Sequence, residues 1–139
     1  MREIRYVNDS DKKFWYSLDK HLPEEEFEEK IRRNMGYVIL NNGIPSGLLR
    51  YNLFWDSLPF CTMLFIDWHM QKKGYGKELL LHWENDMRIK GYGMVLASTQ
   101  ADEYAQHFYR KYGYKDAGSL LINIPGYAQP MEIFMAKKI

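Results

Sequence analysis

The stretch Gln71-Lys72-Lys73-Gly74-Tyr75-Gly76-Lys77 decides the fold prediction, because it places two glycines and three lysines between an apolar run and an amphipathic segment. Glycine lets the backbone turn tightly and brings main-chain amides close to an oxyanion. The N-terminus of the following helix adds free N–H groups and a partial positive charge. The sequence therefore predicts a phosphate-binding turn between a strand and a helix.

Spacing separates the nucleotide-binding motifs that share such a glycine pair. A dinucleotide fingerprint requires a third small residue three positions after Gly76, where Leu79 stands. An ATP-type phosphate loop ends in Gly-Lys-Ser/Thr, whereas Gly76 and Lys77 are followed by Glu78. Both motifs are disfavoured, and on this segment alone a turn that binds no ligand stays open.

The patterns on either side of the turn predict a single α/β domain over residues 1–139. Apolar positions recur with helical period over 75–90 and 105–112, and each segment is followed by a glycine. The unbroken apolar run 94–97 is typical of a strand covered on both faces, so we expect it to pair in parallel with the strand 59–67. The remaining pattern predicts strands at 2–7, 36–41, 44–55, 114–124 and 131–138, and helices at 11–20 and from Pro23 to 33, with Asn8 as a cap.

Composition limits the function classes. Net charge is only +1, so nucleic acid and membrane surfaces are disfavoured partners. There is no long uncharged apolar run and no apolar stretch typical of a secretory signal, which predicts a cytoplasmic protein. The single Cys61 excludes an internal disulfide, and no Cys/His cluster has zinc-ligand spacing, so we expect no metal.

A second block, Ala105-x-x-Phe108-Tyr109-x-Lys111-x-Gly113-Tyr114, lies downstream of the turn. Together with the run Leu64-Phe65-Ile66 and the Gln71-x-x-Gly74-x-Gly76 segment, it resembles the paired motifs of the GNAT N-acetyltransferase superfamily. The resemblance covers essentially the whole chain. It implies the acyl-CoA N-acyltransferase fold, a mixed, mostly antiparallel sheet with a central splayed parallel strand pair flanked by helices.

The resemblance also implies an activity. The chain would be an acyltransferase that moves the acetyl group of acetyl-CoA, its cosubstrate, to a primary amine of a small molecule or peptide by direct transfer in a ternary complex. The alternative is a non-catalytic acyl-CoA-binding sensor, because many relatives carry a Glu on the strand that leads to the coenzyme, whereas the run from Phe60 to Ile66 contains no acid. Asp67 is the nearest carboxylate, and a water chain is the preferred route for the amine proton.

The coenzyme-binding residues are implied by the same resemblance. The backbone of 64–66 would pair with the pantetheine arm beside a bulge near Ile66 and Asp67, and the residues 72–77 would hold the diphosphate. Asp102 stands where many relatives have Asn on the pantetheine side, and its alternative role is to cap the following helix. The full expected set is Leu64, Phe65, Ile66, Gln71, Lys72, Lys73, Gly74, Tyr75, Gly76, Lys77 and Asp102.

Tyr109 matches the general acid of the family, which protonates the departing thiolate. A phenol with a pKa of about 10 is protonated at neutral pH and can donate to sulfur as charge develops. The alternative is that Tyr109 is one member of an apolar helical stripe. An acyl-cysteine on Cys61 is also conceivable, but a lone Cys on an apolar strand is typical of a core residue.

The acceptor site and the oligomeric state are less constrained. An aromatic and acidic groove would suit a cationic amine, although each residue taken singly also suits packing or plain surface. The residues considered are Trp15, Tyr16, Tyr37, Trp55, Tyr127 and the acidic run 24–29. Many proteins that share the fold implied by the resemblance dimerise through the late strands, so a homodimer is expected. The apolar residues there would support it and equally suit a sheet interior: Leu120, Leu121, Ile122, Ile124, Ile133 and Phe134.

Overall fold

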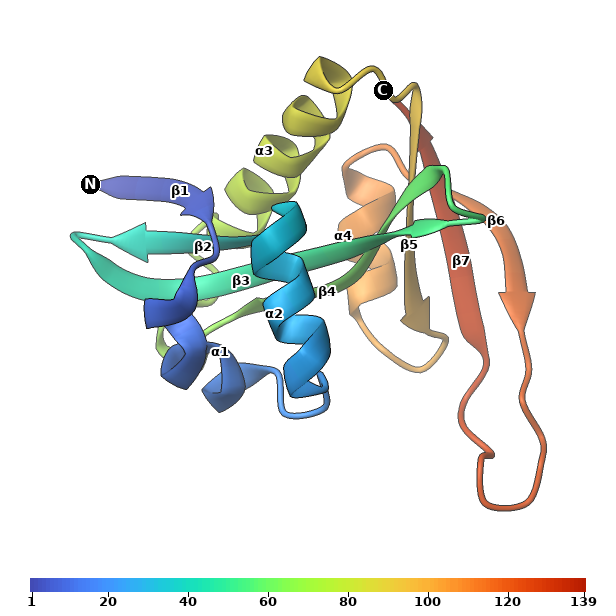
Figure 1. Cartoon of the computed structure of the whole chain (residues 1–139). Helices are drawn as coiled ribbons and strands as arrows, with labels where there is room; N and C mark the ends of the chain where they lie inside the picture. The colour runs from blue at the N-terminus through green and yellow to red at the C-terminus, as the bar shows by residue number, and fades with distance from the viewer. The chain divides into compact units, whose positions relative to one another are not determined.

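The computed structural model describes residues 1–139 and contains seven strands, four α-helices and two short 3₁₀ helices (Figure 1). The strands are β1 (Arg2–Tyr6), β2 (Gly36–Asn41), β3 (Ile44–Phe54), β4 (Leu58–Ile66), β5 (Met94–Gln100), β6 (Lys115–Leu120) and β7 (Glu132–Lys138). The helices are α1 (Lys12–Leu18), α2 (Glu24–Arg33), α3 (Tyr75–Ile89) and α4 (Ala105–Lys111), with 3₁₀ turns at Asp9–Asp11 and Trp68–Met70.

The strands form one sheet in the order β1-β2-β3-β4-β5-β7-β6. Pairing of β1 with β2, β2 with β3, β5 with β7 and β6 with β7 is antiparallel, and β4 pairs with β5 in parallel. The predicted α/β fold with a mixed, mostly antiparallel sheet is confirmed. None of the helices has the length and hydropathy that a membrane span requires.

The chain divides into two compact units, which are described separately. The first unit comprises residues 1–52 and 62–86, and the second comprises residues 53–61 and 87–139. The first unit therefore holds β1, β2, the first nine residues of β3, the end of β4 and most of α3. The second unit holds the last two residues of β3, the beginning of β4, the end of α3 and everything from β5 onward.

Helices cover both faces of the strands in the first unit (Figure 1). On the face covered by α1 and α2, buried apolar side chains form one cluster: Val7, Trp15, Leu22, Phe27, Val38, Leu40 and Leu48. On the face covered by α3, Tyr37 contacts the His82 ring and Tyr51 contacts the Trp83 ring, with centroids 5.6 and 5.8 Å apart. Leu79 is fully buried on the same helix, which confirms the predicted apolar period.

Local backbone signals place most of the element ends. Asn42 and Gly43 both have positive φ, as the predicted hairpin turn between β2 and β3 requires. Pro23 is the N-cap of α2, so this helix begins one residue later than predicted. Asn8 caps the 3₁₀ turn that precedes α1 rather than the α-helix itself.

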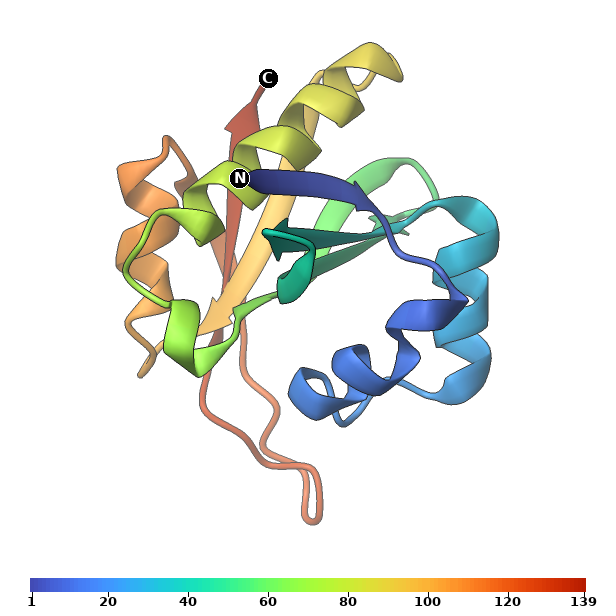
Figure 2. The ribbon, with the colours of Figure 1, turned by 90° about the vertical axis from the view of Figure 1, so that its left-hand side faces the viewer.

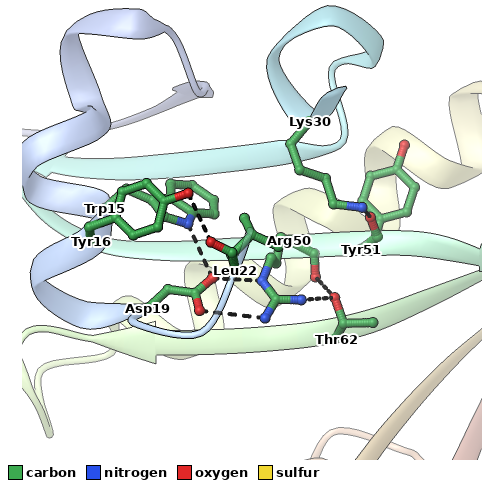
Figure 3. Close-up of polar contacts among 8 residues, drawn as sticks. All are labelled: Trp15, Tyr16, Asp19, Leu22, Lys30, Arg50, Tyr51 and Thr62. Atoms are coloured by element: carbon green, nitrogen blue, oxygen red, sulfur yellow. Dashed lines mark hydrogen bonds and ion pairs between the residues drawn. The ribbon is translucent and has the colours of Figure 1, made fainter. Parts of the chain in front are cut away.

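A buried polar cluster connects α1, β3 and β4 in the first unit (Figure 3). The Asp19 carboxylate is fully buried and accepts hydrogen bonds from Trp15 Nε1 at 3.1 Å and from Arg50 Nε at 2.7 Å. Arg50 Nη1 also donates to Thr62 Oγ1 at 2.8 Å. The cluster therefore holds the end of α1 against the strands.

Lys30 forms a separate contact beside this cluster (Figure 3). Its Nζ donates to the backbone carbonyl of Tyr51 at 2.8 Å, which ties α2 to β3. Burial lowers the pKa of Lys30, because the charged ammonium loses its hydration there.

The late strands of the second unit differ from the predicted bounds. β6 ends at Leu120, four residues earlier than expected, and all six of its residues are exposed. Of the apolar residues considered for a dimer, Leu121 and Ile124 are exposed beyond this strand, whereas Ile133 and Phe134 are half-buried in β7.

We predict that Asp19→Ala lowers the free energy of unfolding by about 3 kcal/mol, because Arg50 then keeps a largely buried charge without its partner. Urea denaturation measures this loss. The control is Glu25→Ala, which removes an exposed carboxylate from α2 and should change stability by about 0.5 kcal/mol. Equal losses in the two variants would show that the buried ion pair adds nothing to stability.

Candidate functional site

The predicted phosphate-binding turn lies in the first unit, between the end of β4 and the beginning of α3. Lys72 and Gly74 both adopt left-handed conformations, with φ of 62° and 87°. The first helical hydrogen bond of α3 runs from Glu78 N to Gly74 O at 3.1 Å. The amides of 75–77 therefore precede the hydrogen-bonded ladder and can bind an anion at the positive end of the helix.

Backbone conformation, rather than crowding, requires glycine at position 74. A Cβ built there would find Arg2 Nη1 as its nearest neighbour, at an ordinary contact distance of 3.5 Å. A positive φ costs an L-residue about 1 kcal/mol or more. The neighbouring Tyr75 is buried and anchors the start of α3, whereas Lys72 and Lys73 are exposed beside the turn.

Arg2, at the beginning of β1, contacts this turn from across the first unit. Its Nη2 donates to the backbone carbonyl of Lys73 at 2.7 Å, and its Nη1 donates to Glu78 Oε1 at 2.5 Å. The guanidinium also lies over the Tyr75 ring, 4.1 Å from its centroid. Figure 2 shows the N-terminal end of β1 beside the beginning of α3.

The Arg2 contacts have two consequences for an anion site. They hold residues on both sides of Gly74, so the turn is fixed by more than its own backbone. They also pair Glu78, whose negative charge at the beginning of α3 would otherwise oppose a bound anion. No local pattern indicates this residue, because Arg2 is 71 positions from Lys73.

The end of β4 is connected to the same turn. Gln71 Nε2 donates to the backbone carbonyl of Ile66 at 3.0 Å. Gly47 of β3 allows close approach here, since a Cβ at this position would lie 2.5 Å from Ile66 Cδ1 and 3.1 Å from Phe65 O. The structure thus brings the predicted residues 64–66, Gln71 and 72–77 together in one unit, and their pairing with a coenzyme stays a prediction.

Tyr109 lies in the second unit, on the buried face of α4. Its side chain is only 6% exposed, and its hydroxyl is in hydrogen-bonding contact with Cys61. Burial is the main cause that raises the pKa of Tyr109 well above 10, and the interaction with Cys61 raises it further. The phenol therefore keeps its proton through the whole neutral range, which suits a proton donor.

Cys61 has the buried position expected of a core residue. It is 2% exposed and pairs in parallel with Ala97 of β5. The structure places the Tyr109 phenol against its thiol, and a phenol that keeps its proton is not a base. This geometry does not support a cysteine nucleophile.

Asp102 does not cap α4, so that alternative prediction is wrong. The residue at the N-cap is Tyr104, and no side chain bonds the first turn of the helix. Asp102 is exposed in the preceding turn, and its contact with the pantetheine arm stays a prediction. In that turn Glu103 Oε1 instead accepts a hydrogen bond from the backbone amide of Gln100 at 3.2 Å.

Glu132, the first residue of β7, is a carboxylate that the sequence analysis did not consider. Ser98 Oγ of β5 donates to Glu132 Oε1 at 3.0 Å. Glu132 pairs with Gln100, two residues after Ser98, so these three side chains lie on one face of the sheet. A Glu in an ordinary strand carries no local signal of function, because only the β5–β7 register places it next to Ser98.

The aromatic groove is predicted incorrectly in two places. Trp15 and Tyr37 are both fully buried in the first unit, so they are core residues and do not line an acceptor site. Tyr16 is half-buried and donates to the backbone carbonyl of Leu22 at 2.9 Å.

The other members of the predicted groove are at the surface. Trp55 and Tyr127 are exposed, at 77% and 75%. In the acidic run 24–29 the four residues Glu24, Glu25, Glu26 and Glu28 are exposed.

No group of three or more His, Cys, Asp or Glu side chains in the structure is arranged to hold a metal ion.

Comparison with known proteins identifies the relatives of this chain. The profile of the Acetyltransferase (GNAT) family matches residues 4–114. No curated protein sequence matches the chain. Among solved structures, the chain is similar to the ribosomal-protein-S18-alanine N-acetyltransferase from Escherichia coli, with a TM-score of 0.83, 19% identity, and coverage of 100% of this chain and 94% of that one.

Two further structures share the fold. Ard1 from Thermoplasma volcanium has a TM-score of 0.85 and 17% identity, covering 99% of this chain and 97% of that one. Arabidopsis thaliana Naa50, solved in complex with the bisubstrate analogue CoA-Ac-MVNAL, has a TM-score of 0.78 and 16% identity, covering 99% of each chain.

We predict that Arg2→Ala loosens the turn at Gly74 and weakens its affinity for pyrophosphate by about threefold, because exposed ion pairs contribute modestly. Amide hydrogen exchange over 74–77 should become faster, and a pyrophosphate titration measures the affinity. The control is Arg32→Ala, which removes the same charge from an exposed pair with Glu29 on α2. If both variants lose the same affinity, the effect is one of net charge and not of the Arg2 contacts.

Proposed function

Because the chain belongs to the GNAT acetyltransferase family, we propose that it transfers the acetyl group of acetyl-CoA to a primary amine of a small molecule or peptide. Transfer would be direct, in a ternary complex of protein, acetyl-CoA and amine. The observation that carries the proposal is the buried Tyr109 phenol, which lies on the helix of the family motif and keeps its proton.

The turn before α3 fits the diphosphate of the coenzyme. Gly74 has the left-handed backbone that turns the chain, and the open amides of 75–77 follow it. The lysines at 72, 73 and 77 would raise the affinity by charge. Gln71 and the backbone of 64–66 would hold the adjoining pantetheine arm. Acetyl-CoA supplies a thioester whose carbonyl carbon is open to attack by an amine.

Tyr109 would donate a proton or a hydrogen bond to the sulfur as the C–S bond breaks. A thiol has an ordinary pKa of about 8.5, so a developing thiolate is basic enough to accept a hydrogen bond from a neutral phenol. Burial strengthens this bond, because little water competes for it. The buried Cys61 beside the phenol favours direct transfer over an acyl-cysteine intermediate.

The class of acceptor is proposed from the relatives. The E. coli structure is named as an alanine N-acetyltransferase of a ribosomal protein, and Naa50 was solved with an analogue that joins coenzyme A to a peptide. These names support testing peptide N-termini beside small amines. The general reaction has one readout for all of them, the release of free coenzyme A thiol.

We predict that Gly74→Ala weakens coenzyme A binding about tenfold, because the strained φ moves the amides that hold the diphosphate. Calorimetry measures the affinity. Gly43→Ala is the matched control: Gly43 also has positive φ, at 80°, and a Cβ there meets nothing within 4 Å. Both variants should lose a similar amount of stability, and only Gly74→Ala should lose affinity. Unchanged affinity in Gly74→Ala would remove the turn from the site.

We predict that Tyr109→Phe lowers kcat about 100-fold with little change in the KM for acetyl-CoA, because it removes the proton donor and keeps the ring. Thiol release with an amine panel measures both constants. The control is Tyr104→Phe, which removes an exposed hydroxyl at the N-cap of the same helix. A Tyr109→Phe protein with wild-type kcat would contradict the acid assignment, and coenzyme binding without any turnover would favour the sensor alternative.

A further inference from the structure

We propose that Glu132 binds the ammonium group of the acceptor and takes its proton. This inference rests on the proposed function and adds the group that the sequence analysis could not find. The group that accepts the amine proton is then Glu132 of β7, rather than Asp67 or a water chain. Four features of the second unit support it: the face on which Glu132 lies, the position of its partner Ser98 on β5, its hydrogen bonding and its aromatic neighbours.

Glu132 and the Tyr109 contact lie on opposite faces of the sheet. Tyr109 contacts Cys61, and Cys61 pairs with Ala97. Ser98, the partner of Glu132, is the next residue along β5. Successive side chains of a strand point to opposite faces and are separated by about 3.4 Å along it. The phenol, which contacts the strand partner of Ala97, and the carboxylate, which is bonded to Ser98, therefore lie near successive residues of β5 on opposite faces.

This arrangement matches what direct transfer needs. The leaving sulfur and the attacking nitrogen lie on different sides of the carbonyl carbon, so the proton donor and the proton acceptor must be separated. An acid and a base within contact of each other would exchange the proton between themselves. Across the sheet from Tyr109, Glu132 can act on the nitrogen while the phenol acts on the sulfur.

The hydrogen bonding of Glu132 leaves it free to bind a cation. Ser98 Oγ donates to Oε1, which holds the carboxylate in place. Neither Glu132 nor Ser98 forms an ion pair with a cationic side chain, and Oε2 has no partner in the protein. The side chain is half-buried, so it is both reachable and partly shielded from water. An ammonium group is the complementary ligand for such a carboxylate.

Aromatic rings stand on the same face as Glu132. Phe134 pairs with Ser98, and Phe60 pairs with Leu96, two residues before Ser98. The two rings lie 5.8 Å apart, and Phe54 is 5.8 Å from the Phe60 ring. All three are half-buried. Ring faces attract a cation and pack against its alkyl or aryl part, so the acceptor is a cationic primary amine with an apolar substituent.

The proton and electron balance closes without a further reactant. The ammonium gives one proton to Glu132, which passes it to water. The nitrogen lone pair then forms the C–N bond, and the C–S bond breaks with its electron pair on sulfur. Tyr109 gives its proton to that sulfur and regains one from water, while Glu132 takes the second proton from the acylated nitrogen and passes it to water. The net products are an amide, a thiol and one proton in solution.

A binding experiment tests the proposed ammonium-binding site at Glu132 without any turnover. The probes are phenethylammonium and its neutral analogue 2-phenylethanol, titrated into the ¹⁵N-labelled protein in the presence of coenzyme A. The amine should shift the amides of Ser98, Glu132 and Phe134 and bind about tenfold more tightly than the alcohol. Glu132→Gln should remove that preference and keep the affinity for coenzyme A. The control is Asp116→Asn, which removes an exposed carboxylate of the same unit.

Kinetics with the same amine test the proton transfer. Glu132→Gln should lower kcat/KM about 100-fold near pH 7. The deficit should narrow as the pH approaches the amine pKa of about 10, because a free amine needs no base. Ser98→Ala removes the hydrogen bond that positions the Glu132 carboxylate, so it should lower kcat/KM by less than Glu132→Gln does. A merely structural role would produce a loss that does not depend on pH.

The outcomes separate this inference from the proposed function. The ammonium-binding site is overturned if the amine binds no more tightly than the alcohol. It is also overturned if the Glu132→Gln protein keeps the wild-type affinity for the amine. Thiol release by Glu132→Gln at the wild-type rate and pH dependence overturns the proton transfer alone. If amine binding depends on Glu132 but the wild-type protein releases no thiol, the ammonium-binding site is supported and the acetyltransferase proposal is overturned.

Discussion

The parallel pairing of β4 with β5 is the constraint on which the chemistry of the second unit depends. It joins Phe60 to Leu96 and Cys61 to Ala97, next to a series of antiparallel pairs between β5 and β7. Because pairing fixes the face of every side chain, it places Cys61 where α4 brings Tyr109. It leaves the next residue of β5 on the other face. A shift of one residue would exchange the two faces.

The first unit contributes a second kind of constraint, a strained turn held at the beginning of a helix. The left-handed conformations at Lys72 and Gly74 cost free energy that the turn cannot recover by itself. The buried Tyr75 and the Arg2 contacts provide the surrounding support. An anion site of this kind needs rigid amides more than it needs lysines, because main-chain N–H groups donate in fixed directions.

The high aromatic content of the chain has a mainly structural explanation in the first unit. Trp15 and Tyr37 are fully buried, and each has a carboxylate partner, Asp19 and Asp86. Trp15 Nε1 and the Tyr37 hydroxyl each donate to one of these carboxylates, which offsets the cost of burying a polar group. The rings proposed to contact the acceptor in the second unit are instead Phe54, Phe60 and Phe134, which composition alone does not distinguish from core residues.

The sequence by itself determined most of the elements, the glycine-containing turn before α3 and the position of Tyr109 on its helix. Each of these depends on residues close together in the chain, through helical period, glycine conformation and short motifs. Only the tertiary structure decided that Arg2 holds the turn, that Asp102 is not a cap, and that Glu132 lies beside Ser98. These facts depend on strand register and on contacts between distant residues, for which a single sequence carries no periodic or local signal.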